Sequence, residues 1–175
     1  LTGKTLGILG LGNLGRTLIP VARALGMRVV AWSRNLSDAR AAAEGVERVG
    51  HDAFFRESDV ITVHLKLSPR SIGYVGVEQL ALMKPSALLV NTSRGPVVDE
   101  AALIDALRSR RIAGAALDVF DREPLPVDHP LRSLPNTLLT PHMGYVSADS
   151  YRIFYAQAIE ALLAFRAGQP VRVLA

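Results

Sequence analysis

The chain has 175 residues, a length that suits one domain with a sizeable core. It contains no cysteine, which excludes disulfide and thiolate chemistry and is typical of a cytoplasmic protein. The formal net charge is +4, and the basic residues are scattered apart from one cluster, Arg108, Arg110 and Arg111, at the end of an expected helix. No apolar run reaches the about 20 residues that span a bilayer. We therefore expect neither a nucleic-acid partner nor a membrane partner.

Short apolar runs alternate with amphipathic segments along the chain. The runs predict strands at Thr5–Leu9, Arg28–Trp32, Val60–Leu65, Ala87–Asn91, Ala113–Leu117 and Thr137–Leu139. The segments between them predict helices at Leu14–Leu25, Ser37–Glu44, Val77–Met83 and Glu100–Arg108, the last with Asp99 as its N-cap. Strands that alternate with helices pair in parallel through right-handed crossovers. Because the strands are almost wholly apolar, we expect an α/β sheet with helices on both faces.

A glycine-rich turn joins the first expected strand to the first expected helix. Residues 10–15 read GLGNLG, the spacing of a dinucleotide fingerprint. Gly10 permits the tight turn, Gly12 lets the backbone approach a pyrophosphate, and Gly15 lets the helix approach the strand. The amides of Asn13 and Leu14 can donate to phosphates from the start of the helix. The turn predicts a Rossmann-type doubly wound parallel sheet that binds a dinucleotide, over residues 1–146.

The end of the second expected strand selects between two nicotinamide nucleotides. An acidic residue there would hold the ribose 2′-hydroxyl. The chain instead has Ser33 and Arg34, which can receive a 2′-phosphate by hydrogen bond and charge. These residues favour NADP(H) over NAD(H). The alternative is that Arg34 is a surface arginine after a strand.

Three polar residues follow three later strands. Arg94 comes after the strand that ends at Asn91, Glu123 precedes Pro124 in the next loop, and His142 comes after the last strand. Ligands bind outside the carboxyl ends of the strands in a doubly wound sheet, so these groups are expected in one cleft. A guanidinium can bind a carboxylate, and a carboxylate can orient an imidazole that exchanges a proton near neutral pH. We predict that Arg94, Glu123 and His142 are catalytic, although each alone could be a capping arginine, a solvated glutamate or a turn histidine.

These segments resemble the D-isomer-specific 2-hydroxyacid dehydrogenases. The resemblance extends over nearly the whole chain and is most specific in three runs, 83–100, 118–124 and 140–144. It implies hydride transfer between NAD(P)H and a small 2-oxo acid such as glyoxylate or hydroxypyruvate, with His142 as acid–base group, Glu123 as its partner and Arg94 on the substrate. It also implies that the cofactor site includes Leu65, Thr92, Ser93, Arg94, Asp118, His142 and Gly144.

One departure from this resemblance concerns the loop after the strand that begins at Val60. Many members carry a proline where this chain has Lys66, and the backbone there usually lines the cofactor cleft. We interpret His64 as a packed or cleft-wall histidine, and His51 and His129 as surface residues. The spacing of the four histidines predicts no metal site.

The last expected helix runs from Ser147, its N-cap, to Ala167 and is apolar along a wide stripe. In the resembling family, a helix after the catalytic histidine packs toward a separate substrate domain. We expect this chain to be the cofactor-binding part of a longer, homodimeric protein, with residues 147–175 forming a helix and tail that pack toward that absent domain. The chain alone could bind cofactor without catalysis. A second interpretation remains, because transcriptional co-repressors that resemble this family use the same fold to sense a cofactor.

Overall fold

The chain forms two compact units in a computed structural model that describes residues 1–173. The first unit comprises Leu1–His142, and the second begins at Met143, whereas we expected the boundary after residue 146. The first unit is an α/β sheet structure, and the described part of the second is built around one long helix.

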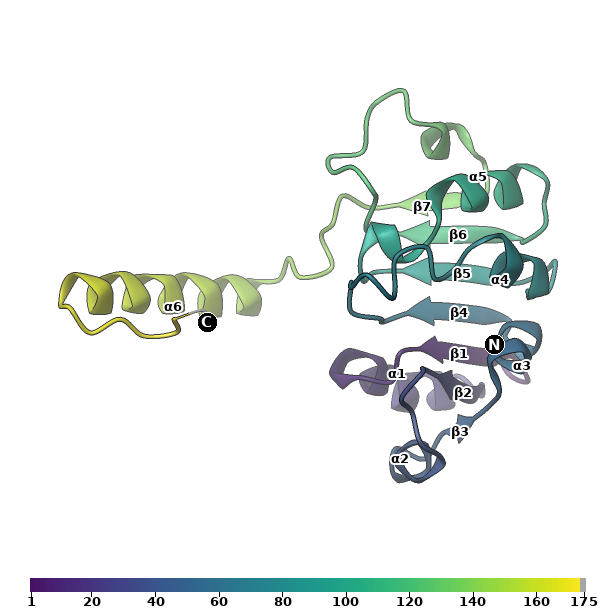
Figure 1. Cartoon of the computed structure of the whole chain (residues 1–175), viewed down its shortest axis with the longest axis horizontal. Coiled ribbons are helices and arrows are strands. Elements are labelled where there is room, and N and C mark those ends of the chain that lie inside the picture. Colours follow the sequence, from purple (N-terminus) through teal and green to yellow (C-terminus); the bar gives the residue numbers. More distant parts are fainter. Residues whose placement is uncertain (174–175) are drawn as a thin grey trace. The chain divides into compact units, whose positions relative to one another are not determined.

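Seven parallel strands form the sheet of the first unit, in the order β3-β2-β1-β4-β5-β6-β7 (Figure 1). The strands are β1 (Thr5–Leu9), β2 (Arg28–Trp32), β3 (Glu47–Arg48), β4 (Val60–Val63), β5 (Leu88–Asn91), β6 (Gly114–Leu117) and β7 (Thr137–Leu139). The strand order reverses between β1 and β4, where doubly wound folds bind their ligands. This arrangement confirms the predicted fold class.

Helices separate onto the two faces of the sheet. The helices of the first unit are α1 (Asn13–Ala24), α2 (Asp38–Ala43), α3 (His51–Glu57), α4 (Val77–Leu82) and α5 (Glu100–Arg108), with short 3-10 turns η1 (Gly95–Val97) and η2 (Pro130–Ser133). Alternate strand residues enter different cores, as Ile8 packs with α1 and α2 while Leu9 packs with α3, α4 and α5. Figure 1 shows α3, α4 and α5 together on the near side of the sheet.

One half of the sheet is open on its second face within the first unit. Leu88 of β5 is 44% exposed and Leu138 of β7 is 67% exposed, although Leu89 beside them is fully buried. The predicted helices lie on both faces of the sheet, and within the first unit they leave one face of β5–β7 exposed. Apolar strand composition indicates burial, but it does not show whether the covering element belongs to the same segment of chain.

β3 and α3 have no counterpart among the predicted elements. β3 has only two residues, both exposed, so it shows no apolar pattern. α3 has seven residues and buries the adjacent Phe54 and Phe55 completely. Because its buried residues are adjacent in sequence, α3 does not show the spacing of three or four residues on which helix prediction depends.

Predicted helix caps are present where the sequence placed them. The Asp99 carboxylate accepts a hydrogen bond from Ala102 N at 3.0 Å, and Ser147 Oγ accepts one from Ser150 N at 3.1 Å. At the far end of α5, Arg108 is exposed as expected, but Arg111 is half-buried and its guanidinium donates to the carbonyl of Ala81. Arg111 therefore connects the end of α5 to α4, whereas Arg108 faces solvent.

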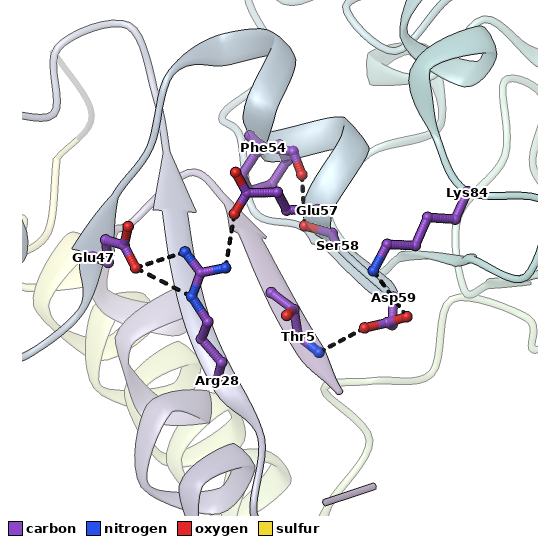
Figure 2. Close-up of polar contacts among 8 residues, drawn as sticks. All are labelled: Thr5, Arg28, Glu47, Phe54, Glu57, Ser58, Asp59 and Lys84. Carbon is purple, nitrogen blue, oxygen red and sulfur yellow. Dashed lines mark hydrogen bonds and ion pairs between the residues drawn. The ribbon is translucent and has the colours of Figure 1, made fainter. Parts of the chain in front are cut away.

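Ion pairs join the strands at their amino-terminal ends (Figure 2). Asp59, just before β4, accepts a hydrogen bond from Thr5 N at 2.8 Å and lies 3.1 Å from Lys84 Nζ. Burial would raise the pKa of Asp59, but the hydrogen bond from Thr5 and the ammonium of Lys84 outweigh it and lower that pKa. At the same edge, Arg28 contacts Glu47 and Glu57, each at 2.7 Å. This edge is held by paired charges and lies at the end of the strands opposite the glycine turn.

The second unit contains α6 (Ala148–Arg166), which has no buried residue. Its exposed apolar side chains are Tyr151, Ile153, Phe154, Tyr155, Ile159, Leu162, Leu163 and Phe165. Among residues 1–173, no helix combines the length and the hydropathy needed to cross a membrane.

Candidate active site and nucleotide cleft

The three glycines of the turn have different surroundings. Gly10 has φ +100°, and a Cβ there would lie 2.9 Å from the carbonyl of His64. A Cβ on Gly15 would lie 2.7 Å from the carbonyl oxygen of Gly10. A Cβ on Gly12, the N-cap of α1, would have no neighbour within 4 Å. Gly10 and Gly15 are therefore required by packing, whereas Gly12 leaves open space in front of the helix start, where an anion is favoured.

A cavity of about 410 Å³ opens beside the turn. Its lining includes most of the residues predicted for the cofactor, namely Gly12, Asn13, Leu14, Gly15, Leu65, Thr92, Ser93 and Arg94. His64, Lys66 and Leu67 complete the lining. The interpretation of His64 as a cleft-wall residue is confirmed, since it lines this cavity and its Nε2 lies 2.9 Å from Thr62 Oγ1. Burial lowers the pKa of His64. The histidine is therefore held neutral in the wall.

A smaller cavity of about 260 Å³ lies at the carboxyl end of β2. Ser33 and Arg34 line it, together with Trp32 and Tyr74, whose rings stack at 5.5 Å. Burial raises the pKa of Tyr74 to about 12, so the phenol stays neutral. His51 packs edge-on against Trp32 at 5.0 Å, and its side chain is 32% exposed. An aromatic partner from β2 half-buries it.

Asn91, the last residue of β5, shapes the loop that carries Arg94. Its side chain is buried, and it accepts a hydrogen bond from Ser93 N at 3.0 Å and donates one to the carbonyl of Arg94 at 2.9 Å. The Arg94 guanidinium donates to the carbonyl of Ser93 at 2.6 Å and is exposed. One amide side chain thus fixes the backbone on both sides of the cation.

The loops after β5 and β6 touch directly at Gly95. A Cβ on Gly95 would lie 2.1 Å from the carbonyl carbon of Phe120, a distance that no side chain can occupy. This contact brings Arg94 next to the segment that carries Glu123. The proximity is also electrostatic, because the charge of Arg94 contributes to lowering the pKa of Glu123.

His142 and Glu123 form a close pair. His142 Nδ1 lies 2.6 Å from Glu123 Oε2, and the other carboxylate oxygen accepts a hydrogen bond from Phe120 N at 3.0 Å. Burial would raise the pKa of Glu123, but the hydrogen bonds from His142 and Phe120 outweigh it, so that pKa is lowered. Glu123 is therefore a carboxylate at neutral pH. It can hold the imidazole in one orientation and stabilise its protonated form.

His142 has a left-handed backbone, with φ +54°. This conformation is unfavourable for a residue other than glycine, and such residues are enriched at functional sites. A cavity of about 510 Å³ lies beside the pair, lined by Phe120, Glu123, Pro124, Leu125, Arg132, Leu139, Thr140, Pro141 and His142. The His142–Glu123 pair therefore faces a largely apolar space at the carboxyl edge of the sheet.

Two supporting interactions were not anticipated from the sequence. Thr140 Oγ1 donates to Asp118 Oδ1 at 2.5 Å, which joins the ends of β6 and β7 and orients the buried Asp118. His129 Nε2 lies 3.0 Å from Glu100 Oε1, and the His129 side chain is 16% exposed. The prediction that His129 is a surface residue is wrong, because it connects the turn η2 to the start of α5.

The structure brings the predicted site residues to one edge of the sheet, except for Gly144. Arg94, Glu123, Asp118 and His142 all follow the carboxyl ends of β5, β6 and β7. Gly144 belongs to the second unit, so its cofactor role stays a prediction. Among the described residues, no group of His, Cys, Asp or Glu is arranged to hold a metal ion.

The fold and cleft define a dinucleotide-binding α/β domain with a histidine–carboxylate pair at its carboxyl edge. The chain belongs to the D-isomer specific 2-hydroxyacid dehydrogenases, because residues 1–144 match the NAD binding domain of that family.

Similar proteins carry different enzyme names. The chain is 41% identical to a glyoxylate reductase of Aeropyrum pernix, a match that covers 97% of this chain and 50% of that protein. It is also 41% identical to a D-3-phosphoglycerate dehydrogenase of Bacillus subtilis, covering 98% of this chain and 32% of that one. The crystal structure of a phosphoglycerate oxidoreductase from Vibrio cholerae O395 superposes with a TM-score of 0.90 at 38% identity, covering 95% of this chain and 54% of that one. The chain thus spans about half, or less, of these relatives, and equal identity to two named activities does not select a substrate.

Proposed function

We propose that this chain is the nucleotide-binding part of an NAD(P)H-dependent reductase of small 2-oxo acids, which also oxidises the corresponding D-2-hydroxy acids. The observation that carries the proposal is the 2.6 Å contact between His142 and Glu123 at the carboxyl edge of a doubly wound sheet. The glycine turn and its 410 Å³ cavity open at the same edge. The family to which the chain belongs supports the reaction class.

The chain's residues fit a nicotinamide dinucleotide. The space in front of Gly12, which a Cβ would partly fill, accepts the pyrophosphate next to the amides of Asn13 and Leu14. Asp118, whose carboxylate accepts a hydrogen bond from Thr140, would orient the nicotinamide amide. The bound dinucleotide supplies the hydride that reduces the carbonyl carbon.

Proton transfer falls to His142. Because Nδ1 contacts Glu123, Nε2 is the atom that exchanges a proton with the substrate oxygen. In reduction the imidazolium donates this proton to the oxygen as negative charge develops there, and in oxidation the neutral ring removes it. Glu123 keeps the ring oriented through both protonation states. Arg94 binds the substrate carboxylate or polarises the carbonyl. Its planar guanidinium, which can donate two parallel hydrogen bonds, is suited to either role.

We also propose that NADP(H) is preferred over NAD(H). Ser33 and Arg34 occupy the end of β2, and no acidic residue lines the 260 Å³ cavity there. A 2′-phosphate therefore meets a cation and a hydroxyl and no opposing carboxylate. The proposal includes a homodimer for the full-length protein, as is expected from its family resemblance.

The catalytic proposal is tested in the full-length protein with His142→Asn. Turnover of glyoxylate or hydroxypyruvate is expected to fall by about 10²–10⁴-fold, the usual contribution of a positioned acid–base group. Affinity for the nucleotide should fall far less than turnover. Equal loss of turnover and nucleotide affinity would assign His142 a structural role and refute the proposal.

The nucleotide preference is tested on the 175-residue chain by the fluorescence of Trp32, which lines the smaller cavity. Titration with NADPH should give tighter binding than titration with NADH, and Arg34→Ala should remove the difference. Tighter binding of NADH would refute the preference and leave the reaction class standing. Absence of binding by either nucleotide would refute the proposal that this chain is the nucleotide-binding part.

A further inference from the structure

A second set of cations lines the cavity that holds Ser33 and Arg34. This set comes from the loop between β4 and α4, which contributes Lys66 and Arg70. Ser33, Ser68 and Ser71 add three hydroxyls to the lining. Among the described residues, the lining contains three cations and no carboxylate.

The three cations differ from other arginines of the described chain in their ion pairing. Within residues 1–173, no ion pair involves Arg34, Lys66 or Arg70, whereas Arg28 and Arg48 each pair with carboxylates on neighbouring elements. Like charges around one cavity repel one another, and an anion in that cavity relieves the repulsion. The charge pattern therefore fits an anionic ligand group.

The loop that carries the second set is internally braced. Ser71 is buried, and its hydroxyl donates to the carbonyl of Lys66 at 2.7 Å. The same hydroxyl accepts a hydrogen bond from Ser68 N at 2.8 Å. One buried serine thus fixes the backbone between Lys66 and Arg70, so that the two side chains extend from a preorganised loop.

We propose that Lys66 and Arg70 join Arg34 in a three-cation clamp for the 2′-phosphate of an adenine dinucleotide. This inference rests on the proposed function, since it assigns to the same nucleotide site two residues beyond the pair at the end of β2. A phosphate monoester carries a charge of about −1.5 to −2 near pH 7, which the clamp neutralises. The stacked rings of Trp32 and Tyr74, with Leu65, provide an apolar surface for the adenosine that bears it.

The two loop cations differ in the cavities that they line. Lys66 also lines the 410 Å³ cavity next to the glycine turn, whereas Arg70 lines only the smaller one. Arg70 is therefore the residue whose effect should be confined to the 2′-phosphate, and Lys66 can contact either phosphate group.

The test compares two ligand fragments on the 175-residue chain by calorimetry or Trp32 fluorescence. Adenosine 2′,5′-bisphosphate carries the 2′-phosphate, and adenosine 5′-monophosphate does not. Wild-type chain should prefer the bisphosphate. Arg70→Ala should reduce that preference by about tenfold, as expected for one charge-assisted contact, while leaving the affinity for the monophosphate within about twofold. Lys66→Ala should reduce the preference similarly and weaken both ligands.

The matched control is Arg108→Ala, which removes an exposed arginine at the end of α5 that does not line the cavity. It should change neither affinity by more than about twofold. If Arg34→Ala removes the preference while Lys66→Ala and Arg70→Ala do not, the clamp is refuted and the proposed nucleotide function stands. If the wild-type chain does not prefer the bisphosphate, the NADP(H) preference fails together with the clamp. If it binds neither fragment nor NADPH or NADH, the nucleotide function itself is refuted.

Discussion

Replacing Gly12 or Gly15 by alanine should separate the two purposes of the glycine turn. The two residues lie one helical turn apart, yet their surroundings differ. A Cβ on Gly12 meets nothing within 4 Å, whereas a Cβ on Gly15 lies 2.7 Å from the carbonyl oxygen of Gly10 and 2.9 Å from Ile8 Cγ2. We expect Gly12→Ala to impair nucleotide binding alone and Gly15→Ala to impair folding stability.

The magnitudes follow from opposing contributions at each position. At Gly12, alanine is a poorer N-cap than glycine by about 0.5–1 kcal/mol. Alanine also reduces the conformational entropy of the unfolded chain, which stabilises the folded state by about 0.4–1 kcal/mol. The free energy of unfolding should therefore stay within about 0.5 kcal/mol of the wild-type value. At Gly15, alanine favours the helix by about 1 kcal/mol, but forcing a methyl group against backbone costs about 1–3 kcal/mol or more. A net loss of about 1–2 kcal/mol lowers the Tm of a chain of this size by roughly 2–8 °C.

Thermal unfolding with and without NADPH distinguishes the two effects. Gly12→Ala should keep the Tm of the ligand-free wild type and lose most of the increase that saturating nucleotide gives, because stabilisation by a ligand depends on its affinity. Gly15→Ala should unfold at lower temperature without ligand. A Gly12→Ala chain that binds nucleotide like the wild type, or a Gly15→Ala chain that is equally stable, would refute this division of roles.

Three other predictions concern the catalytic pair, the amino edge of the sheet and the core. In the full-length protein, Glu123→Gln should move the pH profile of reduction toward lower pH. The reason is that the imidazolium of His142 no longer has a carboxylate at 2.6 Å to stabilise it. An unchanged profile would show that Glu123 takes no part in proton transfer. Asp59→Asn should lower the free energy of unfolding at pH 7 by about 1–2 kcal/mol. Because the folded-state pKa of Asp59 is lowered, this contribution is present above the unfolded pKa and is lost as pH falls through the folded pKa. In urea unfolding, the difference in stability between wild type and Asp59→Asn should therefore shrink in acid. A difference that does not change with pH would contradict the stabilising role of the Asp59 carboxylate. Leu107 is 1% exposed, and Leu107→Ala should lower the free energy of unfolding in urea by about 2–5 kcal/mol. Leu163 is 58% exposed, and Leu163→Ala should lower it by less than about 1 kcal/mol. Equal losses would show that the two sites are equally buried in solution.

Much of the sheet could be predicted because its strands are continuous apolar runs bounded by turns. The strands from β1 to β7 were placed to within two residues, except for β3, whose two exposed residues carry no pattern. Helix α5 was placed exactly at its observed bounds because Asp99 marks its start. The open face of β5–β7 could not be predicted, since the hydropathy of Leu88 and Leu138 does not reveal which segment covers them.

The candidate site was predictable where strand ends bring residues together, and less so where contacts depend on register. Parallel pairing places the residues after β5, β6 and β7 at one edge, so the proximity of Arg94, Glu123 and His142 follows from topology. The bond between Thr140 and Asp118 depends on how β6 and β7 align, which no local pattern specifies. The burial of His129 likewise depends on a partner 29 residues away.

The charges of the first unit are distributed unevenly between the two edges of the sheet. At the amino edge, Arg28 and Lys84 are neutralised by carboxylates, whereas the cations around the smaller cavity at the other edge are not. A positive potential confined to the entrance of a cleft accelerates the diffusional encounter of anions and orients them on approach. Association of a phosphorylated nucleotide should therefore be fast at low ionic strength and slow steeply as salt shortens the Debye length, while its dissociation changes much less.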